Sequence, residues 1–175
     1  CTGTFLKGQF IMGDVKYSAG RQGEPSSDEL PDNLIKYGFE LDRYQTATPP
    51  RVDRNSIDFS KMEELKGEDK PRYFSYETGK EMLKYSPIVT GVVSTKGPRH
   101  CPSLDRKIMN FPEKTNHQIF LEQESVESNE IYINGFTTAM PPFAQEAMLR
   151  TIAGLENAKI VRYGYAVEYD FIPAH

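Results

Sequence analysis

A strand-rich α+β fold is what the sequence predicts for this 175-residue chain. Short runs of β-branched and aromatic residues recur between turns rich in glycine and proline, which is the pattern of strands joined by loops. Only two stretches carry apolar residues at helical spacing, so we expect few helices. Hydrophobic residues make up 38% of the chain and include ten Tyr and ten Phe, which is enough to form a core.

The first half of the chain predicts three strands and one helix. Gly8 separates the first two strands, and Leu30 and Leu34 lie on one face of the helix. Pro49 and Pro50 lack the amide donors of a ladder, so the third strand ends before them. The expected elements are strands at 4–6 and 9–12, a loop at 17–25, a helix from Ser26 or Ser27 to Gly38, and a strand at 40–46.

The second half predicts a charged excursion, six strands and a second helix. Pro141 and Pro142 favour a helix start, and Ala144, Met148 and Ile152 follow at helical spacing. The expected elements are a solvated excursion at 60–84, strands at 88–94, 108–111, 118–122 and 130–133, a turn at Asn134-Gly135, a helix at 141–157, and strands at 159–162 and 165–171.

Charge and composition exclude several classes of protein. With 21 Lys and Arg against 25 Asp and Glu, the formal charge is −4, which argues against a strongly basic nucleic-acid module. Two cysteines exclude a disulfide framework and a four-cysteine zinc site, and we expect a reducing, cytoplasmic setting. No apolar run approaches the roughly 20 residues of a membrane span. Because the chain enters an apolar run directly from Cys1, we expect it to be a piece of a longer protein.

The stretch from Gly97 to Ser103 is the densest candidate for chemistry. Cys101 follows Arg99 and His100, and Lys107 lies close in sequence, so positive neighbours favour the nucleophilic thiolate. The alternative is a small, half-buried cysteine beside solvated basic residues. From the residues alone the alternative is favoured, because free cysteine is usually buried and inert.

Two arginines and one short polar stretch are weaker candidates. Arg21 and Arg51 each lie in a loop rich in Gly or Pro, where a guanidinium could bind phosphate but more often ties down its own loop. Thr2, Gly3 and Thr4 precede the first predicted strand, where glycine would let the backbone approach a cofactor. No GxGxxG or GxxxxGK[ST] motif occurs, so a complete nucleotide-binding βαβ unit is absent from the sequence.

Taken together, eight stretches resemble the central part of the MnmG family, also called GidA, the flavoproteins of bacterial tRNA wobble-uridine modification. Each stretch is modest alone, but their order and spacing are specific and cover the chain from Cys1 to about Pro173. The stretches are residues 2–6, 17–21, 48–51, 97–103, 117–122, 134–135, 154–158 and 164–170.

The resemblance implies an enzyme that binds FAD, uses NADH and acts on tRNA. It would work as a homodimer together with the GTPase MnmE, and no membrane association is expected. A folate derivative is a further possible cofactor. The implied fold is part of an FAD-binding domain of the glutathione-reductase type, with residues 60–95 as an insertion between parts at 1–59 and 96–175. The family's FAD fingerprint would lie upstream and its helical domain downstream, so we expect these 175 residues alone to be inactive.

The resemblance also assigns roles to individual residues. Cys101 matches the family cysteine thought to be catalytic, and Thr2 to Thr4 match the stretch along the flavin. Arg99 matches the arginine of the cysteine loop, and Arg21 and Arg51 match family arginines of the Gly-rich and Pro-Pro loops. We expect Arg99, His100, Arg21, Arg51 and Lys107 to bind substrate or phosphate.

The chain departs from the family pattern at several positions. His100 replaces a Tyr, Tyr163 replaces a Pro, and a family stretch near Leu83 and Lys84 is missing. We expect a chain break or poor order at 83–85. Two other functions stay open: a folate- and FAD-dependent tRNA uridine C5 methyltransferase of the TrmFO type, and a non-catalytic binding or dimerisation segment.

Overall fold

The computed structural model of the chain describes residues 3–65, 103–104, 107, 110–111, 113–114 and 117–173. The chain divides into two compact units, one formed by Cys1–Met62 with His100–His175 and the other by Glu63–Arg99. Almost all of the second unit lies outside the described residues, as do the strand expected at 88–94 and the break expected at 83–85. The boundaries expected at 60 and 95 therefore stay predictions.

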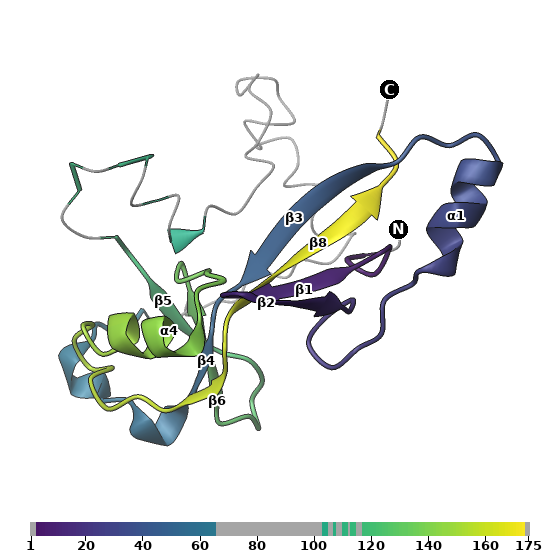
Figure 1. Cartoon of the computed structure of the whole chain (residues 1–175). Coiled ribbons are helices and arrows are strands. Elements are labelled where there is room, and N and C mark those ends of the chain that lie inside the picture. The colour runs from purple at the N-terminus through teal and green to yellow at the C-terminus, as the bar shows by residue number, and fades with distance from the viewer. Residues whose placement is uncertain are drawn as a thin grey trace, which may run out of the picture. The chain divides into compact units, whose positions relative to one another are not determined.

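Four antiparallel strands form the first sheet, in the order β2-β1-β8-β3 (Figure 1). They are β1 (Gln9–Met12), β2 (Val15–Ser18), β3 (Asp42–Thr48) and β8 (Tyr165–Phe171). β3 pairs with β8 along all seven residues, from Asp42 opposite Phe171 to Thr48 opposite Tyr165. Helix α1 (Glu29–Lys36) lies in the connection from β2 to β3.

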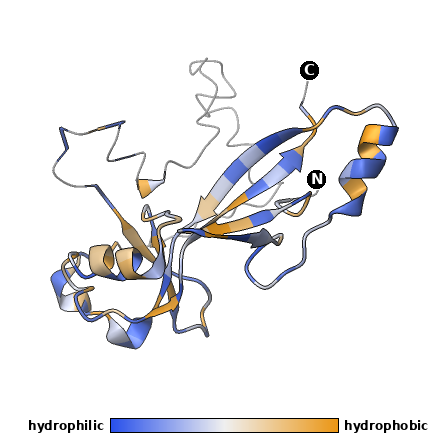
Figure 2. Ribbon diagram, viewed as in Figure 1, coloured by the Kyte–Doolittle hydropathy of each residue, from blue (hydrophilic) through white to orange (hydrophobic). Residues whose placement is uncertain are grey.

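Figure 2 shows that hydropathy changes from residue to residue along the strands of this sheet. Because successive side chains point to opposite faces of a sheet, its two faces carry different contacts. On one face, the Phe10 ring stacks between Tyr17 and Tyr165, with ring centroids 4.7 Å apart on both sides. On the other face, Arg43 forms an ion pair of 2.6 Å with Asp170, and Lys16 forms one of 3.0 Å with Glu168. The contact between Phe10 and Tyr165 and the two ion pairs thus join strands that are distant in sequence.

The second sheet has the order β5-β6-β4-β7 and is also antiparallel. Its strands are β4 (Arg51–Asp53), β5 (Phe120–Gln123), β6 (Glu130–Asn134) and β7 (Ile160–Arg162), with short 3-10 turns at Arg54–Ser56 and Phe59–Lys61. Helix α4 (Pro142–Leu149) adds Leu149 to the core of this half. The buried core residues are Val52, Leu104, Ile131, Ile133, Phe136, Leu149, Leu155 and Ala158.

A buried crossing joins the two sheets, because β3 continues into β4 and β7 continues into β8. Gln145 is fully buried there. Its amide nitrogen donates to the carbonyls of Met140 and Gly164 at 2.6 and 2.8 Å, and its oxygen accepts from the Gly164 N–H at 2.7 Å. A Cβ on Gly164 would lie 2.7 Å from the Thr48 carbonyl oxygen and 2.9 Å from that of Thr138, so the strands can cross only at glycine.

The strand-rich α+β class is confirmed, and β8 has the predicted bounds. The strand expected at 4–6 is wrong, because only Leu6 makes a bridge, to Ser27. The loop expected at 17–25 is wrong at its start. Val15–Ser18 pairs with β1 through a two-residue turn at Gly13 and Asp14, and Gly13 has a φ of +56°. A Gly-Asp pair between two apolar runs is itself a hairpin signal.

Three further elements differ from the prediction. The second helix ends at Leu149 rather than at 157, and the chain then turns through Gly154, whose φ is +86°. Of the strand expected at 108–111, residues 108 and 109 lie outside the described residues, and the other half is wrong, since the amide of Phe111 donates to the Lys107 carbonyl in a helical i to i−4 bond. Asp28, rather than Ser26 or Ser27, occupies the N-cap position of helix α1, and its side chain makes no capping hydrogen bond.

Replacing Gln145 with Met is expected to lower the free energy of unfolding by about 2–3 kcal/mol, because it leaves buried backbone groups at Met140 and Gly164 without partners. The matched control is Gln45→Met on β3, where the exposed side chain makes no hydrogen bond to any described residue. Urea denaturation measures both. Equal small losses for the two variants would contradict the role of Gln145.

Candidate functional site

The segment that follows the predicted cysteine is anchored to the end of β6. Cys101 lies outside the described residues, together with Arg99 and His100, but Ser103, Leu104 and Lys107 are described. The Leu104 amide donates to the Thr137 carbonyl at 2.7 Å, and the Leu104 side chain lies in the core. The Lys107 amide donates to the Ser103 carbonyl at 3.0 Å, which makes this segment a helical turn.

Lys107 provides a second anchor through its side chain. Its Nζ donates to the Gly135 carbonyl at 2.9 Å in a partly buried position. Gly135 has a φ of +93°, and a Cβ there would lie 2.9 Å from the Gln118 carbonyl oxygen, so this turn requires glycine. The Asn134-Gly135 turn was predicted from the sequence, but nothing in the sequence indicated that it receives the lysine.

The predicted cofactor stretch packs against the loop that carries Arg21. Gly3 has a φ of +62°, and the Thr4 hydroxyl donates to the Gly20 carbonyl at 2.8 Å. A Cβ on Gly20 would overlap the Phe5 ring at 1.9 Å, so the two glycine-rich loops are in direct contact. Thr2, the remaining residue of the predicted stretch, lies outside the described residues.

Arg21 binds within its own loop. Its guanidinium forms a forked pair with the Glu24 carboxylate, and this pair raises the pKa of Arg21. The guanidinium carbon also lies 5.8 Å from the centre of the Phe5 ring. The Arg21 side chain is 61% exposed, so water screens the pair with Glu24.

Arg51 is held more firmly. It donates to the Thr48 hydroxyl at 2.6 Å and to the Pro49 carbonyl at 2.9 Å, and its Nε lies 2.6 Å from a Glu124 oxygen. Its guanidinium carbon lies 4.8 Å from the centre of the Tyr132 ring, and the side chain is 18% exposed. Arg51 therefore fastens the connection from β3 to β4.

Comparison with known proteins identifies the family. The family model for glucose inhibited division protein A matches residues 1–84 and 77–175. The chain belongs to this family. It is 60% identical to the tRNA uridine 5-carboxymethylaminomethyl modification enzyme MnmG 1 of Fusobacterium nucleatum over 195 residues, and 45% identical to MnmG of Bacillus mycoides over 193. These alignments cover 99% and 98% of this chain.

Solved GidA structures agree in fold. The structure of Aquifex aeolicus GidA in its form II crystal matches with a TM-score of 0.81 and 36% identity over 98% of this chain, which corresponds to 31% of the Aquifex chain. The form I crystal matches with the same TM-score. The chain also spans about a third of the length of the two MnmG relatives, 31% in each case.

The form of the family match bears on the stretch expected to be missing near Leu83. The family model matches this chain in two parts, residues 1–84 and 77–175, which overlap at 77–84, so the match is interrupted there. The Fusobacterium alignment has 195 positions, whereas this chain has 175 residues, so at least 20 of its positions are gaps in this chain. Both findings agree with a GidA-family stretch that this sequence lacks.

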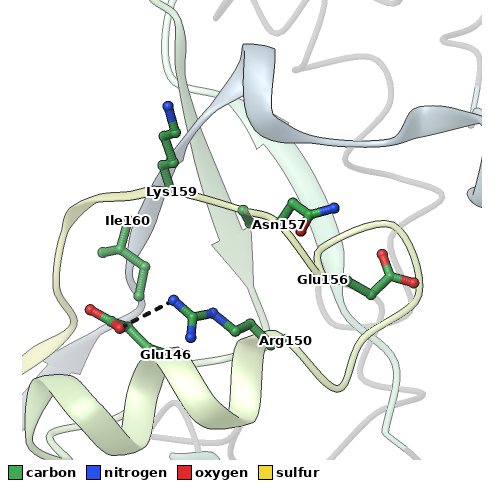
Figure 3. A pocket seen from close by; sticks show the side chains of 7 residues that line it. Glu146, Arg150, Glu156, Asn157, Lys159 and Ile160 are labelled. Carbon is green, nitrogen blue, oxygen red and sulfur yellow. Dashed lines mark hydrogen bonds and ion pairs between the residues drawn. The ribbon is translucent and has the colours of Figure 1, made fainter.

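A hollow of about 570 Å³ lies between the end of α4 and the start of β7 (Figure 3). None of the residues that the sequence analysis singled out for the site lines it. Its two carboxylates already have partners: Glu146 accepts from the Tyr163 hydroxyl at 2.6 Å, and Glu156 accepts from Lys61 at 2.8 Å and from the Gly154 amide at 2.9 Å. The hollow is lined by Glu146, Arg150, Glu156, Asn157, Ala158, Lys159 and Ile160.

Among the described residues, no group of His, Cys, Asp and Glu side chains is placed to hold a metal ion. None of the helices in the described part of the chain has the length and apolar character of a membrane crossing.

The pH dependence of stability is expected to reveal the bond between Tyr163 and Glu146. This bond raises the pKa of the Tyr163 phenol above its ordinary value, because it requires the phenolic proton, and burial acts in the same direction. Its stabilisation is complete below the pKa of the unfolded state, about 10, and is lost as the pH rises through the higher pKa of the folded state. Above about pH 10, stability should therefore fall more steeply than in Tyr163→Phe.

Denaturation measured between pH 8 and 11 tests this expectation. Tyr37→Phe is the matched control, because Tyr37 is 84% exposed. Its pH profile should follow that of the unsubstituted protein, and a Tyr163→Phe profile that also follows it would refute the expectation.

Proposed function

We propose that the protein containing this chain is an FAD-dependent enzyme that modifies C5 of the wobble uridine of tRNA. The observation that carries the proposal is the 60% identity, across 99% of this chain, with a protein named as a tRNA uridine 5-carboxymethylaminomethyl modification enzyme. We further propose that it uses NADH, works in the cytoplasm as a homodimer with the GTPase MnmE, and takes its one-carbon unit from a folate derivative.

Cys101 is the proposed nucleophile. C5 of uridine is weakly nucleophilic, and addition of a thiolate at C6 turns C5 into an enolate-like carbon that can attack an electrophilic carbon. Loss of the C5 proton and departure of the thiolate then restore the ring. Arg99 and His100 adjoin Cys101 in sequence, and positive charge there favours the thiolate.

Gly3 and Thr4 are the described residues proposed to lie along the flavin, which supplies the redox chemistry when bound. They fit only part of such a site. Gly3 is exposed and has a left-handed backbone, but the Thr4 hydroxyl already donates to Gly20. The diphosphate of FAD needs backbone donors at a glycine-rich turn, and no such motif occurs in this sequence. That part of the site would come from elsewhere in the full-length protein.

Of the two candidate phosphate-binding arginines that the structure describes, Arg21 is the better proposal. Its pair with Glu24 is exposed, and water weakens such pairs, so a tRNA phosphate could replace the carboxylate. Arg51 would have to abandon Thr48, Pro49 and Glu124 together.

Replacing Cys101 with Ser in the full-length enzyme is expected to abolish wobble-uridine modification, because a serine hydroxyl is not ionised near neutral pH and adds poorly to C6. Mass spectrometry of tRNA nucleosides measures the product. Flavin absorbance serves as the control for folding and should persist, since the flavin is proposed to contact Gly3 and Thr4 rather than Cys101. Undiminished modification by this variant would exclude Cys101 as the nucleophile.

The same nucleoside analysis separates the alternatives. A folate- and FAD-dependent methyltransferase of the TrmFO type would yield 5-methyluridine instead of an aminomethyl-type product. A protein in which this segment only binds or dimerises would modify tRNA equally well with and without the Cys101→Ser substitution.

A further inference from the structure

One face of the first sheet carries aromatic side chains in two stacked groups. In the first group, the Phe10 ring lies between those of Tyr17 and Tyr165. In the second, the Tyr44 ring stacks on that of Phe171, with the centroids 3.6 Å apart, and Tyr169 lies beside Tyr44. We call this surface the aromatic face; it consists of Phe10, Tyr17, Tyr44, Tyr165, Tyr169 and Phe171.

The register of the strands places both groups on the same side of the sheet. Phe10 is opposite Val167, and Tyr44 is opposite Tyr169, which lies two residues further along β8. Because side chains two residues apart on a strand point to the same side, the two groups share one face. The aromatic face therefore extends across all four strands, from β2 at one edge to β3 at the other.

The outer part of the aromatic face is open to solvent. Tyr17 on β2 is 45% exposed, and Tyr44 on β3 is 48% exposed. Val15, two residues from Tyr17 on the same strand, is 52% exposed. An antiparallel sheet with one apolar face normally packs that face against another layer. The described residues thus leave both edges of this apolar face half uncovered.

The charges around the sheet favour an apolar protein surface as the partner rather than a nucleic acid. The register places no Lys, Arg or His on this side of the four strands, and the one charged residue there is Asp42. Proteins that stack bases on aromatic rings also need cations for the phosphates. Here Lys16 and Arg43 lie on the opposite face, in ion pairs with Glu168 and Asp170.

The two ends of the described chain meet at one end of this sheet. The Asp170 amide donates to the Leu6 carbonyl at 2.7 Å, so the segment that leads into β1 lies beside the end of β8. This chain corresponds to 31% of the length of each of its two MnmG relatives. In a protein of that length, further chain is attached close to the aromatic face. A short tether gives an attached segment an effective concentration in roughly the millimolar range, which favours it over a separate molecule.

We propose that the aromatic face is an intramolecular docking surface. Apolar side chains from the part of the full-length protein outside residues 1–175 cover it and remove its half-exposed rings from water. The contact fixes β3 and β8, the strands that continue into the second sheet, to the remainder of the enzyme. The inference depends on the length of the relatives and not on the proposed chemistry of Cys101, so loss or retention of activity in Cys101→Ser leaves it unaffected.

Hydroxyl-radical footprinting of the unsubstituted full-length protein tests whether the face is covered. Mass spectrometry gives the oxidation rate of each ring in the native protein relative to its rate in urea. Phe10 is the buried reference, because it is 2% exposed. Tyr17 and Tyr44 should be protected about as strongly as Phe10. Oxidation at about half the rate in urea, which their 45% and 48% exposure predicts for an open face, would overturn the proposal.

A photoreactive group at position 44 of the full-length protein identifies what covers the face. Tyr44 is replaced by benzoylphenylalanine, and the matched control carries the same group at Gln45, whose side chain points to the opposite face of β3. We expect a product with the mass of one polypeptide, in which residue 44 is joined to a residue outside 1–175. The yield of that product should be several-fold lower in the control.

Each other occupant gives a different product, and each would overturn the proposal. A second copy of the protein gives a product with the mass of two polypeptides, and tRNA gives a protein–RNA product. A cross-link to residues 63–99 would assign the face to the second compact unit of this chain. Absence of a cross-link, or equal yields from positions 44 and 45, would overturn it as well. If the variant at position 44 does not fold, the group is placed at Tyr17 and judged by the same criteria.

Discussion

The buried amide of Gln145 is the contact on which both sheets depend. β3 is followed directly by β4, and β7 by β8, so the chain crosses between the two sheets twice. Both crossings lie at Gly164 and its neighbours. A buried crossing leaves backbone groups that water cannot reach, and Gln145 satisfies those of Met140 and Gly164 from a single side chain. Because Gly164 has no Cβ, the passes approach closely enough for β8 to align with β3 over its full length.

The same crossing explains why Arg51 is structural. Pro49 and Pro50 are fully buried, and neither can donate a backbone hydrogen bond. The guanidinium of Arg51 supplies donors to Thr48 and Pro49 just where the prolines supply none. Arg21 has no such task, because the bonds between Arg21 and Glu24 close a surface loop that solvent surrounds. Two arginines in similar sequence contexts thus differ in their freedom to meet a ligand.

The positions of most strands were predictable, because the residue pattern along a strand is a local property. β8 was predicted with its bounds, whereas β3 begins and ends two residues later than predicted and runs to Thr48, directly before the proline pair. The strand predictions that failed concern segments whose backbone conformation depends on hydrogen bonds outside the local run of residues. The run at 4–6 has the composition of a strand, but the Thr4 hydroxyl and the Phe5 carbonyl bond to loop residues Gly20 and Ser27 instead. At 108–111 the apolar residues suggested a strand, whereas the bonds through Lys107 make a helical turn.

The sequence by itself determined the α+β class, the positions of most strands along the chain, and the family, since these follow from local patterns and from motifs in register. Only the tertiary structure decided what individual polar side chains do. Lys107 and Gly135 are 28 residues apart in sequence, and Gln145 and Gly164 are 19 apart. No local rule pairs such residues, because a hydrogen bond depends on distance in space, and the packing of the core sets that distance.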